Sequence, residues 1–260
     1  MLQRFIFLLS FILVSSANAQ STRTIAFYNV ENLFDTLDHP TNNDNEFLPE
    51  GSYEWTSERY NTKIARINQV IDSLEVPMIL GMCEIENEKV VQDVVNAGSM
   101  KNTHAIVHYE SLDQRGIDNA IIYDKTVLTL VESGIIRFDM PAPSSPSRDI
   151  VWAKFSRGKD TILTMVNHWP SRRGGQVESE PKRLVAATAA SNFVDSVLNE
   201  NKKMNIVFMG DLNDYPSNRT AQMIAESLKP MIVKESGKHG GSHNYLSLIH
   251  ISEPTRRPII

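Results

Sequence analysis

Four segments of the chain place side chains that could do chemistry directly after short, mostly apolar runs. One of these runs, at 205–209, leads into Gly210-Asp211-Leu212-Asn213. A short apolar run bounded by glycine is typical of a buried strand. A carboxylate and a carboxamide at its exposed end could hold a metal ion or a phosphate oxygen. The alternative for this segment alone is an ordinary turn, which Asp and Asn also favour.

Two earlier segments end in the same way. Asn29 lies between apolar residues at 27–30, so its amide is expected to have fixed partners. Glu84 follows the apolar run at 78–83, where a carboxylate is costly unless it is paired or bound to a cation. A hard divalent cation would stabilise Glu84 at this position. The alternative is a charge that precedes the start of a helix at 88–95.

The fourth segment closes an apolar run at 161–166 with Asn167 and His168. A histidine can act as a general acid or base near neutral pH, although a histidine that closes a strand is often only packed and hydrogen-bonded. Arg172 and Arg173 follow it, together with two glycines, in a loop suited to phosphate contacts.

Together the four segments supply the groups needed for metal-assisted hydrolysis of a phosphoester. A divalent cation polarises a phosphoryl oxygen. A carboxylate or an imidazole can activate water, and amide and guanidinium groups can stabilise the charge that develops.

These side chains require a scaffold of alternating strands and helices, as in an α/β or α+β domain. Apolar periodicity predicts helices at 57–74, 88–95 and 178–198, the first capped by Thr56 or Ser57. It predicts strands at 24–30, 77–83, 104–109, 119–123, 126–131, 150–155, 161–167 and 205–209. Residues 139–149 form a loop rich in Pro and Ser. No repeat or linker is visible, so we expect one domain.

Composition sets further bounds on this domain. The chain has 260 residues, a net charge of −5 and one cysteine, Cys83. A single cysteine cannot form an internal disulfide, and its apolar context predicts a buried, inert thiol. The acidic balance argues against a broad nucleic-acid-coating surface. It is compatible with an enzyme that grips one phosphate at a metal centre.

The N-terminus has the pattern of an export signal. Arg4 precedes an apolar core at 5–14, and Ala17-Asn18-Ala19 is a small-x-small cleavage site. The core is shorter than the roughly 20 residues that span a bilayer. We therefore predict a signal peptide at 1–19 and an exported protein, periplasmic or extracellular. It is expected to be monomeric and to have no membrane anchor after cleavage.

From Thr24 to Tyr245 the chain resembles the endonuclease/exonuclease/phosphatase superfamily, in particular its deoxyribonuclease-like branch. The resemblance rests on ordered motifs: Tyr-Asn-Val-Glu-Asn around Asn29, Cys-Glu-Ile-Glu-Asn around Glu84, Asn-His-Trp-Pro-Ser around His168, and Gly-Asp-Leu-Asn at 210–213. It implies an α/β (α+β) fold, a four-layer α/β/β/α sandwich of two mixed sheets with outer helices.

The resemblance also implies roles for residues at the metal and the phosphate. Glu84 matches the ligand of Mg²⁺ (or Mn²⁺), and Asn29 matches an asparagine that contacts the metal-site carboxylate and the phosphate. Asp211 and Asn213 match the pair that positions water and the scissile phosphate.

Other positions match the deoxyribonuclease-like branch. His168 corresponds to its general acid and Asp118 to an acidic partner that orients this histidine. Arg148 resembles a phosphate-contacting arginine, and Arg115 and Arg172 are further candidates for substrate contact. The alternatives are that Asp118 simply starts a strand and that Arg148 is a solvated loop charge.

The chain departs from the family pattern at its end. The family closes with an Asp after a Tyr-rich segment and with a terminal Ser-Asp-His, and neither follows Tyr245. Residues 246–256 resemble the translation of a transposon-end sequencing adapter. We therefore expect a domain at 20–245 that lacks its last strands, a non-native tail at 246–260, and weak or no activity. The alternative is a native tail in which His250 replaces the missing histidine.

The expected function is that of an exported, metal-dependent phosphodiester hydrolase, an endonuclease acting on DNA or RNA. The set of His168, Asp118 and Arg148 favours nucleic acid as the substrate. Two alternatives stay open: a phosphodiesterase or phosphatase acting on lipid or small-molecule phosphoesters, and a binding scaffold without catalysis.

Overall fold

A computed structural model describes residues 23–231 and 250–251. The predicted signal peptide at 1–19 lies outside the described residues, as does all of the predicted tail at 246–260 except His250 and Ile251. Both assignments stay predictions.

The first sheet has four strands in the order β1-β2-β4-β3. Strands β1 and β2 are parallel, and the other two pairs are antiparallel, so the sheet is mixed. Two helices, α1 and α2, pack on its outer face. The bounds are β1 Ile25–Leu33, β2 Ile79–Ile85, β3 His104–His108, β4 Asp118–Asp124, α1 Ser57–Ser73 and α2 Glu88–Ala97.

The second sheet has five strands in the order β5-β6-β7-β8-β9. Strands β7 and β8 are parallel and all other neighbours are antiparallel. Helices α3 and α4 cover its outer face. The bounds are β5 Thr129–Ile136, β6 Ile150–Arg157, β7 Asp160–His168, β8 Asn205–Asp211, β9 His250–Ile251, α3 Gln176–Glu200 and α4 Arg219–Ala225.

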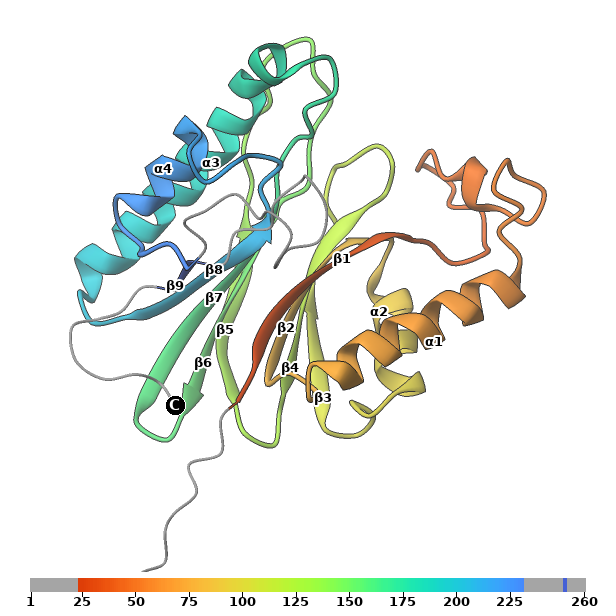
Figure 1. Cartoon of the computed structure of the whole chain (residues 1–260), viewed down its shortest axis with the longest axis horizontal. Helices are drawn as coiled ribbons and strands as arrows, with labels where there is room; N and C mark the ends of the chain where they lie inside the picture. Colours follow the sequence, from red (N-terminus) through yellow and green to blue (C-terminus); the bar gives the residue numbers. More distant parts are fainter. Residues whose placement is uncertain (1–22, 232–249, 252–260) are drawn as a thin grey trace, which may run out of the picture.

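The layers follow one another as helices, sheet, sheet and helices (Figure 1), which confirms the predicted α/β/β/α sandwich. Apolar side chains of both sheets fill the space between them, including Ile121, Val166 and Met209. The sheets approach closely at Gly81, where a Cβ atom would lie 2.7 Å from Val166 Cγ2 and 2.8 Å from Met209 Cε.

Local sequence explains why the helices of the first layer begin where they do. The hydroxyl of Thr56 accepts a hydrogen bond from the N–H of Arg59, and the amide oxygen of Asn87 accepts one from Val90. Such caps satisfy backbone donors that the first helical turn leaves free. The buried Ile64 and Ile71 lie on the face of α1 toward the sheet, as the apolar spacing predicted.

The structure differs from the sequence-based elements in a few places. The strand predicted at 126–131 begins later, because Asp124 Oδ1 accepts hydrogen bonds from both the N–H and the hydroxyl of Thr126 and forms a turn there. A 3-10 helix at Asn45–Phe47, helix α4 and strand β9 were not predicted. In the described part of the chain, no helix combines the length and the apolar character that a membrane span requires.

Candidate active site

The predicted site residues of four strands meet at one edge of the sandwich. Asn29 lies in the middle of β1, where its regular pairing with β2 ends, and Glu84 lies near the end of β2; these strands are parallel. His168 ends β7 and Asp211 ends β8, and these strands are also parallel. Parallel neighbours place their carboxyl ends at the same edge of a sheet, so each sheet contributes two of the four side chains.

The carboxamide of Asn29 joins the two sheets at this edge. Its Nδ2 donates hydrogen bonds to Glu84 Oε1 at 3.2 Å and to Asp211 Oδ2 at 3.1 Å. Its Oδ1 accepts a hydrogen bond from the N–H of Glu31 at 2.9 Å, which fixes the amide orientation. One amide thus holds two carboxylates that are 127 positions apart in the sequence.

Irregular backbone directs these side chains toward solvent. The pairing of β2 with β4 shifts between Cys83 and Ile85, and Glu84 adopts a φ of 61°. Both neighbours of Glu84 are fully buried, whereas its own side chain is partly exposed. A bulge of this kind re-aims a side chain at a strand end. In β1, Glu31 and Asn32 also have positive φ, beside a register shift after Asn29.

His168 is buried beside Glu84. Its Nε2 lies 3.6 Å from Glu84 Oε1, and its Nδ1 has no hydrogen-bond partner in the described part of the chain. Burial and the nearby charges of Arg148 and Arg115 hold the pKa of His168 well below its ordinary value. The imidazole is therefore neutral near pH 7, which suits it to donate a hydrogen bond from a ring N–H.

Asp211 and Asn213 form a tight turn at the end of β8. The N–H of Asn213 donates to Asp211 Oδ1 at 3.0 Å, and Asn213 Nδ2 donates to the carbonyl of Trp169 at 2.9 Å. Burial raises the pKa of Asp211, and the Glu84 carboxylate raises it further. Hydrogen bonds from Asn213 and Asn29 lower this pKa but do not cancel the increase.

The backbone at Gly210 permits this turn. Gly210 has a φ of 155°, and a Cβ atom there would lie 2.1 Å from the carbonyl oxygen of Asn167 on β7. We expect Gly210→Ala to lower the free energy of unfolding by about 3 kcal/mol, because backbone must shift to relieve the overlap. Urea denaturation would measure the change.

Gly158→Ala is the matched control, since Gly158 has a φ of 61° and nothing within 4 Å of its added Cβ. In that variant the free energy of unfolding should fall by only about 1 kcal/mol, because the added Cβ introduces conformational strain but no overlap. Equal losses at the two positions would contradict the close approach of β7 and β8 at Gly210.

The residues present fit a divalent cation at Glu84. The carboxylates of Glu84 and Asp211 share only one amide donor, Asn29 Nδ2, and the mutual repulsion contributes to the raised pKa of Asp211. A cation would relieve that repulsion, and carboxylate and carboxamide oxygens are the ligands that Mg²⁺ and Mn²⁺ prefer.

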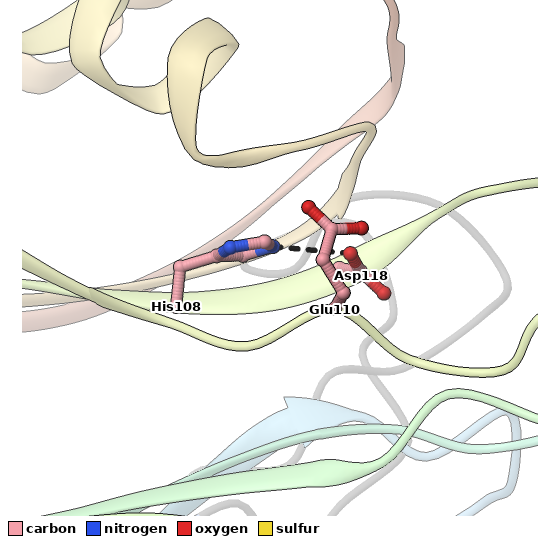
Figure 2. Close-up of side chains that lie close together, drawn as sticks. All are labelled: His108, Glu110 and Asp118. Atoms are coloured by element: carbon pink, nitrogen blue, oxygen red, sulfur yellow. Dashed lines mark hydrogen bonds and ion pairs between the residues drawn. The ribbon is translucent and has the colours of Figure 1, made fainter. Parts of the chain in front are cut away.

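Asp118 is not paired with His168. Its Oδ2 accepts a hydrogen bond from His108 Nε2 at 3.0 Å, and its Oδ1 accepts one from the N–H of Ser111. Figure 2 shows His108 of β3 reaching Asp118 at the start of β4. The predicted Asp118–His168 contact is therefore wrong in this structure, because a nearer histidine on the adjacent strand takes the carboxylate. A role of Asp118 in catalysis stays a prediction.

The group around Asp118 has the composition of a cation site. Ligand atoms of His108, Glu110 and Asp118 all lie within 4.8 Å of one another (Figure 2). Burial and the Asp118 carboxylate raise the pKa of Glu110. This group had no counterpart among the sequence-based predictions.

The predicted arginines have different surroundings. Arg148 is buried and donates to Asp113 Oδ2 at 3.1 Å and to the carbonyl of Trp169 at 2.9 Å. Arg115 is about half exposed, with its Nε 3.6 Å from Asp113. Neither lines the cleft described below. Their contacts with a phosphate stay predictions, and their charges act on His168.

Arg172 does line the cleft. Its Nε donates to the carbonyl of Asn213 at 2.8 Å, and its guanidinium lies over the ring of Tyr215 at 4.0 Å. The guanidinium is thus held next to the turn that carries Asp211. Arg173, the following residue, lines the same cleft.

The strand ends form the floor of a cleft of about 1180 Å³. Asn29, Glu84, Asp211 and Asn213 line it together with Arg172, so the structure brings five of the predicted site residues to one open space. His168 does not line it. Sequence reasoning missed another wall of this cleft, which comes from α1 and the segment before it. That wall includes Tyr53, Arg59 and Lys63, and their positions carried no motif that could have marked them.

Solved structures with the same fold include the following three. The catalytic domain of human Nocturnin is 16% identical, with a TM-score of 0.57 over 73% of this chain and 74% of its own. Truncated TDP2 of Caenorhabditis elegans is also 16% identical, with a TM-score of 0.59 over 76% and 79%. A mannosyl-6-phosphatase of Bacteroides thetaiotaomicron is 15% identical, with a TM-score of 0.62 over 90% and 86%. At these identities the likeness shows the fold alone.

Comparison by sequence gives one family. Residues 24–252 match the profile of the family described as "Endonuclease/Exonuclease/phosphatase family". A comparison with curated proteins found no match.

Proposed function

Because the chain belongs to the endonuclease/exonuclease/phosphatase family, we propose that it is a metal-dependent phosphodiester hydrolase that cleaves DNA or RNA as an endonuclease. Members of this family are hydrolases that act on phosphoester bonds. The observation that carries the proposal is the double hydrogen bond of Asn29 to Glu84 and Asp211, which line an open cleft. The buried imidazole of His168 lies 3.6 Å from Glu84.

In the proposed reaction, Glu84 would hold a Mg²⁺ or Mn²⁺ ion. Such an ion would polarise a phosphoryl oxygen and offset the negative charge of the transition state. Asp211, whose raised pKa makes it a better proton acceptor than a solvated carboxylate, orients the attacking water and receives its proton. Asn29 and Asn213 position the water and the phosphate between them.

His168 does not line the cleft, and its buried Nε2 lies 3.6 Å from Glu84 Oε1. In the proposed reaction its neutral imidazole donates a hydrogen bond from a ring N–H to an oxygen on which negative charge develops once a substrate is bound. Arg172, held over Tyr215, lies where it can contact a neighbouring phosphate oxygen. We also propose that the protein is exported, which rests on the sequence of residues 1–19, and that it is a monomer.

A hydrolase of small-molecule or lipid phosphoesters is the second candidate. This alternative is kept because solved structures with this fold include a mannosyl-6-phosphatase. The two candidates share Glu84, Asn29 and Asp211, so they differ in what the cleft admits rather than in the chemistry at its floor.

A plasmid-nicking assay tests the proposal. We expect the protein to convert supercoiled plasmid to nicked circles with Mg²⁺ or Mn²⁺, slowly because of the expected loss of the last strands, and to give no conversion in excess EDTA. His168→Ala should slow nicking by about 10²-fold, the usual contribution of one positioned imidazole or donor. Phosphate release from mannose 6-phosphate, without any nicking, would instead identify the second candidate.

A further inference from the structure

One wall of the cleft is aromatic and cationic. We call it the α1 wall and define it by Phe47, Tyr53, Trp55, Arg59 and Lys63, all of which line the same cleft as Glu84 and Asp211. The first three residues precede α1, and the last two belong to it. The chemistry at the floor of the cleft requires none of them.

The aromatic part of the wall is rigid. The ring of Phe47 stacks on Phe34 at 4.1 Å with an interplanar angle of 12°, and Tyr53 lies on Phe47 at 5.0 Å. The indole N–H of Trp55 donates to the carbonyl of Phe34 at 2.9 Å. Tyr53 ends this packed series with 49% of its surface exposed. A fixed ring with an open face is a surface on which a planar group can stack.

The cationic part of the wall is available to an anion. Arg59 and Lys63 are four residues apart on α1, so they lie on one face of the helix. Arg59 donates to the carbonyl of Tyr53, and Lys63 donates to the carbonyl of Glu31 at 2.6 Å. In the described part of the chain, neither residue forms an ion pair with a carboxylate. Carbonyl contacts hold the two side chains in place without neutralising their charge.

Cations therefore flank the carboxylate centre. Arg172 and Arg173 line the cleft together with Arg59 and Lys63, while the carboxylates of Glu84 and Asp211 lie at its floor. A single phosphate group would contact only the residues around Glu84 and Asp211. The cleft, with a volume of about 1180 Å³, is larger than one phosphate requires. This distribution fits a chain that carries several phosphates and planar bases.

We propose that the α1 wall binds a single-stranded stretch of nucleic acid next to the scissile phosphate, with one base on Tyr53 and phosphates on Arg59 and Lys63. This inference rests on the proposed nuclease function and specifies its substrate. A cationic groove with an exposed aromatic ring is the arrangement that binds single strands without strong sequence preference. A duplex buries the faces of its bases, so it cannot offer one to Tyr53.

Fluorescence anisotropy tests the wall independently of cleavage. The probe is a fluorescein-labelled dT12, compared with a 12-base-pair duplex, in Ca²⁺ at several salt concentrations. We expect tighter binding of dT12 than of the duplex. Tyr53→Ala should weaken dT12 binding about 10-fold, and Tyr53→Phe should restore it. The double variant Arg59→Ala/Lys63→Ala should reduce the slope of log K against log salt by about 1.4, since each phosphate contact on a single strand contributes roughly 0.7.

Lys159→Ala is the matched control for loss of one cation. Lys159 is exposed in the hairpin that precedes β7, at the end of that strand away from His168, and this variant should bind dT12 as the wild type does. Thermal melting of each variant confirms that the fold is retained.

Two results would overturn the inference. If the wild type prefers the duplex, or if the wall variants bind dT12 with wild-type affinity and salt dependence, the α1 wall does not bind single strands. Plasmid nicking by the wild type in either case would leave the proposed hydrolase in place. Absence of nicking together with full dT12 binding would instead reject the hydrolase and retain the binding surface.

Discussion

Replacing Glu84 by Gln is expected to lower the rate of phosphodiester hydrolysis about 10³-fold. In the proposed reaction the charge of Glu84 would hold the cation, and polarisation by a bound cation contributes several kcal/mol to transition-state stabilisation, at about 1.4 kcal/mol for each factor of ten. Gln keeps the size of the side chain and an oxygen that can accept the hydrogen bond of Asn29. The rate is measured by plasmid nicking in Mn²⁺.

Titration calorimetry measures the affinity of the same variant for Mn²⁺, which does not depend on turnover. The affinity for Mn²⁺ should fall by at least 10-fold in Glu84→Gln. Glu132→Gln removes an equivalent charge from an exposed position of β5 and should leave both measurements unchanged. A Glu84→Gln protein that nicked plasmid at the wild-type rate would show that Glu84 does not hold the catalytic cation.

Replacing Asp214 by Ala is expected to lower the free energy of unfolding by about 3–5 kcal/mol. Asp214 and Arg183 are both fully buried, and Arg183 Nε donates to Asp214 Oδ2 at 3.1 Å. The same carboxylate accepts hydrogen bonds from Gln176, Asn218 and Thr220. Loss of the carboxylate leaves a buried guanidinium without its counter-charge, which is the costly outcome.

Thermal denaturation would detect this loss as a fall in Tm of about 10 °C, given roughly 2–4 °C per kcal/mol for a domain of this size. Asp195→Ala removes an exposed carboxylate that accepts a hydrogen bond from the hydroxyl of Ser227, and it should cost less than about 0.5 kcal/mol. Equal effects of the two substitutions would mean that the buried network does not stabilise the end of β8.

The pH dependence of Asp214 has a definite sign. Burial opposes its ionisation, but hydrogen bonds from Thr220, Gln176 and Asn218 and the charge of Arg183 outweigh burial and lower its pKa. Because the pKa of Asp214 is lowered by folding, the folded protein binds fewer protons at this group than the unfolded chain does. The stability that the ionised Asp214 contributes is therefore present above the pKa of the unfolded state, and it is lost as the pH falls through the pKa of the folded state. The difference in free energy of unfolding between the wild type and Asp214→Asn should therefore become smaller as the pH is lowered.

Much of the fold was accessible from the sequence, because apolar periodicity records which residues face a core. The helix predicted at 57–74 matches α1, and the run before Gly210 matches β8, since both bury continuous apolar surfaces. The predicted start of β5 was wrong because the side chain of Asp124 forms a turn with Thr126 before the strand. Apolar periodicity does not reveal such a hydrogen bond between a side chain and the backbone.

The site was predictable only in part. Residue type and position at strand ends located Asn29, Glu84, His168 and Asp211, because polar groups after buried strands need partners. The partner of Asp118 was not predictable, since it depends on the register of β3 against β4, which brings His108 close. The bulges that turn Glu84 and Glu31 outward, and the wall formed by α1, depend on how distant segments pack.

The origin of the site in two separate sheets has a mechanical consequence. Asn29 and Glu84 belong to one sheet, while His168 and Asp211 belong to the other. The distances between these two pairs of residues therefore depend on how far apart the sheets lie. A side chain added at Gly81, where Val166 and Met209 already fill the gap, would spread the sheets and loosen the hydrogen bond of Asn29 to Asp211. Core residues that never approach a substrate thus share control of catalytic geometry, and sequence drift in the interior is constrained by activity as well as by stability.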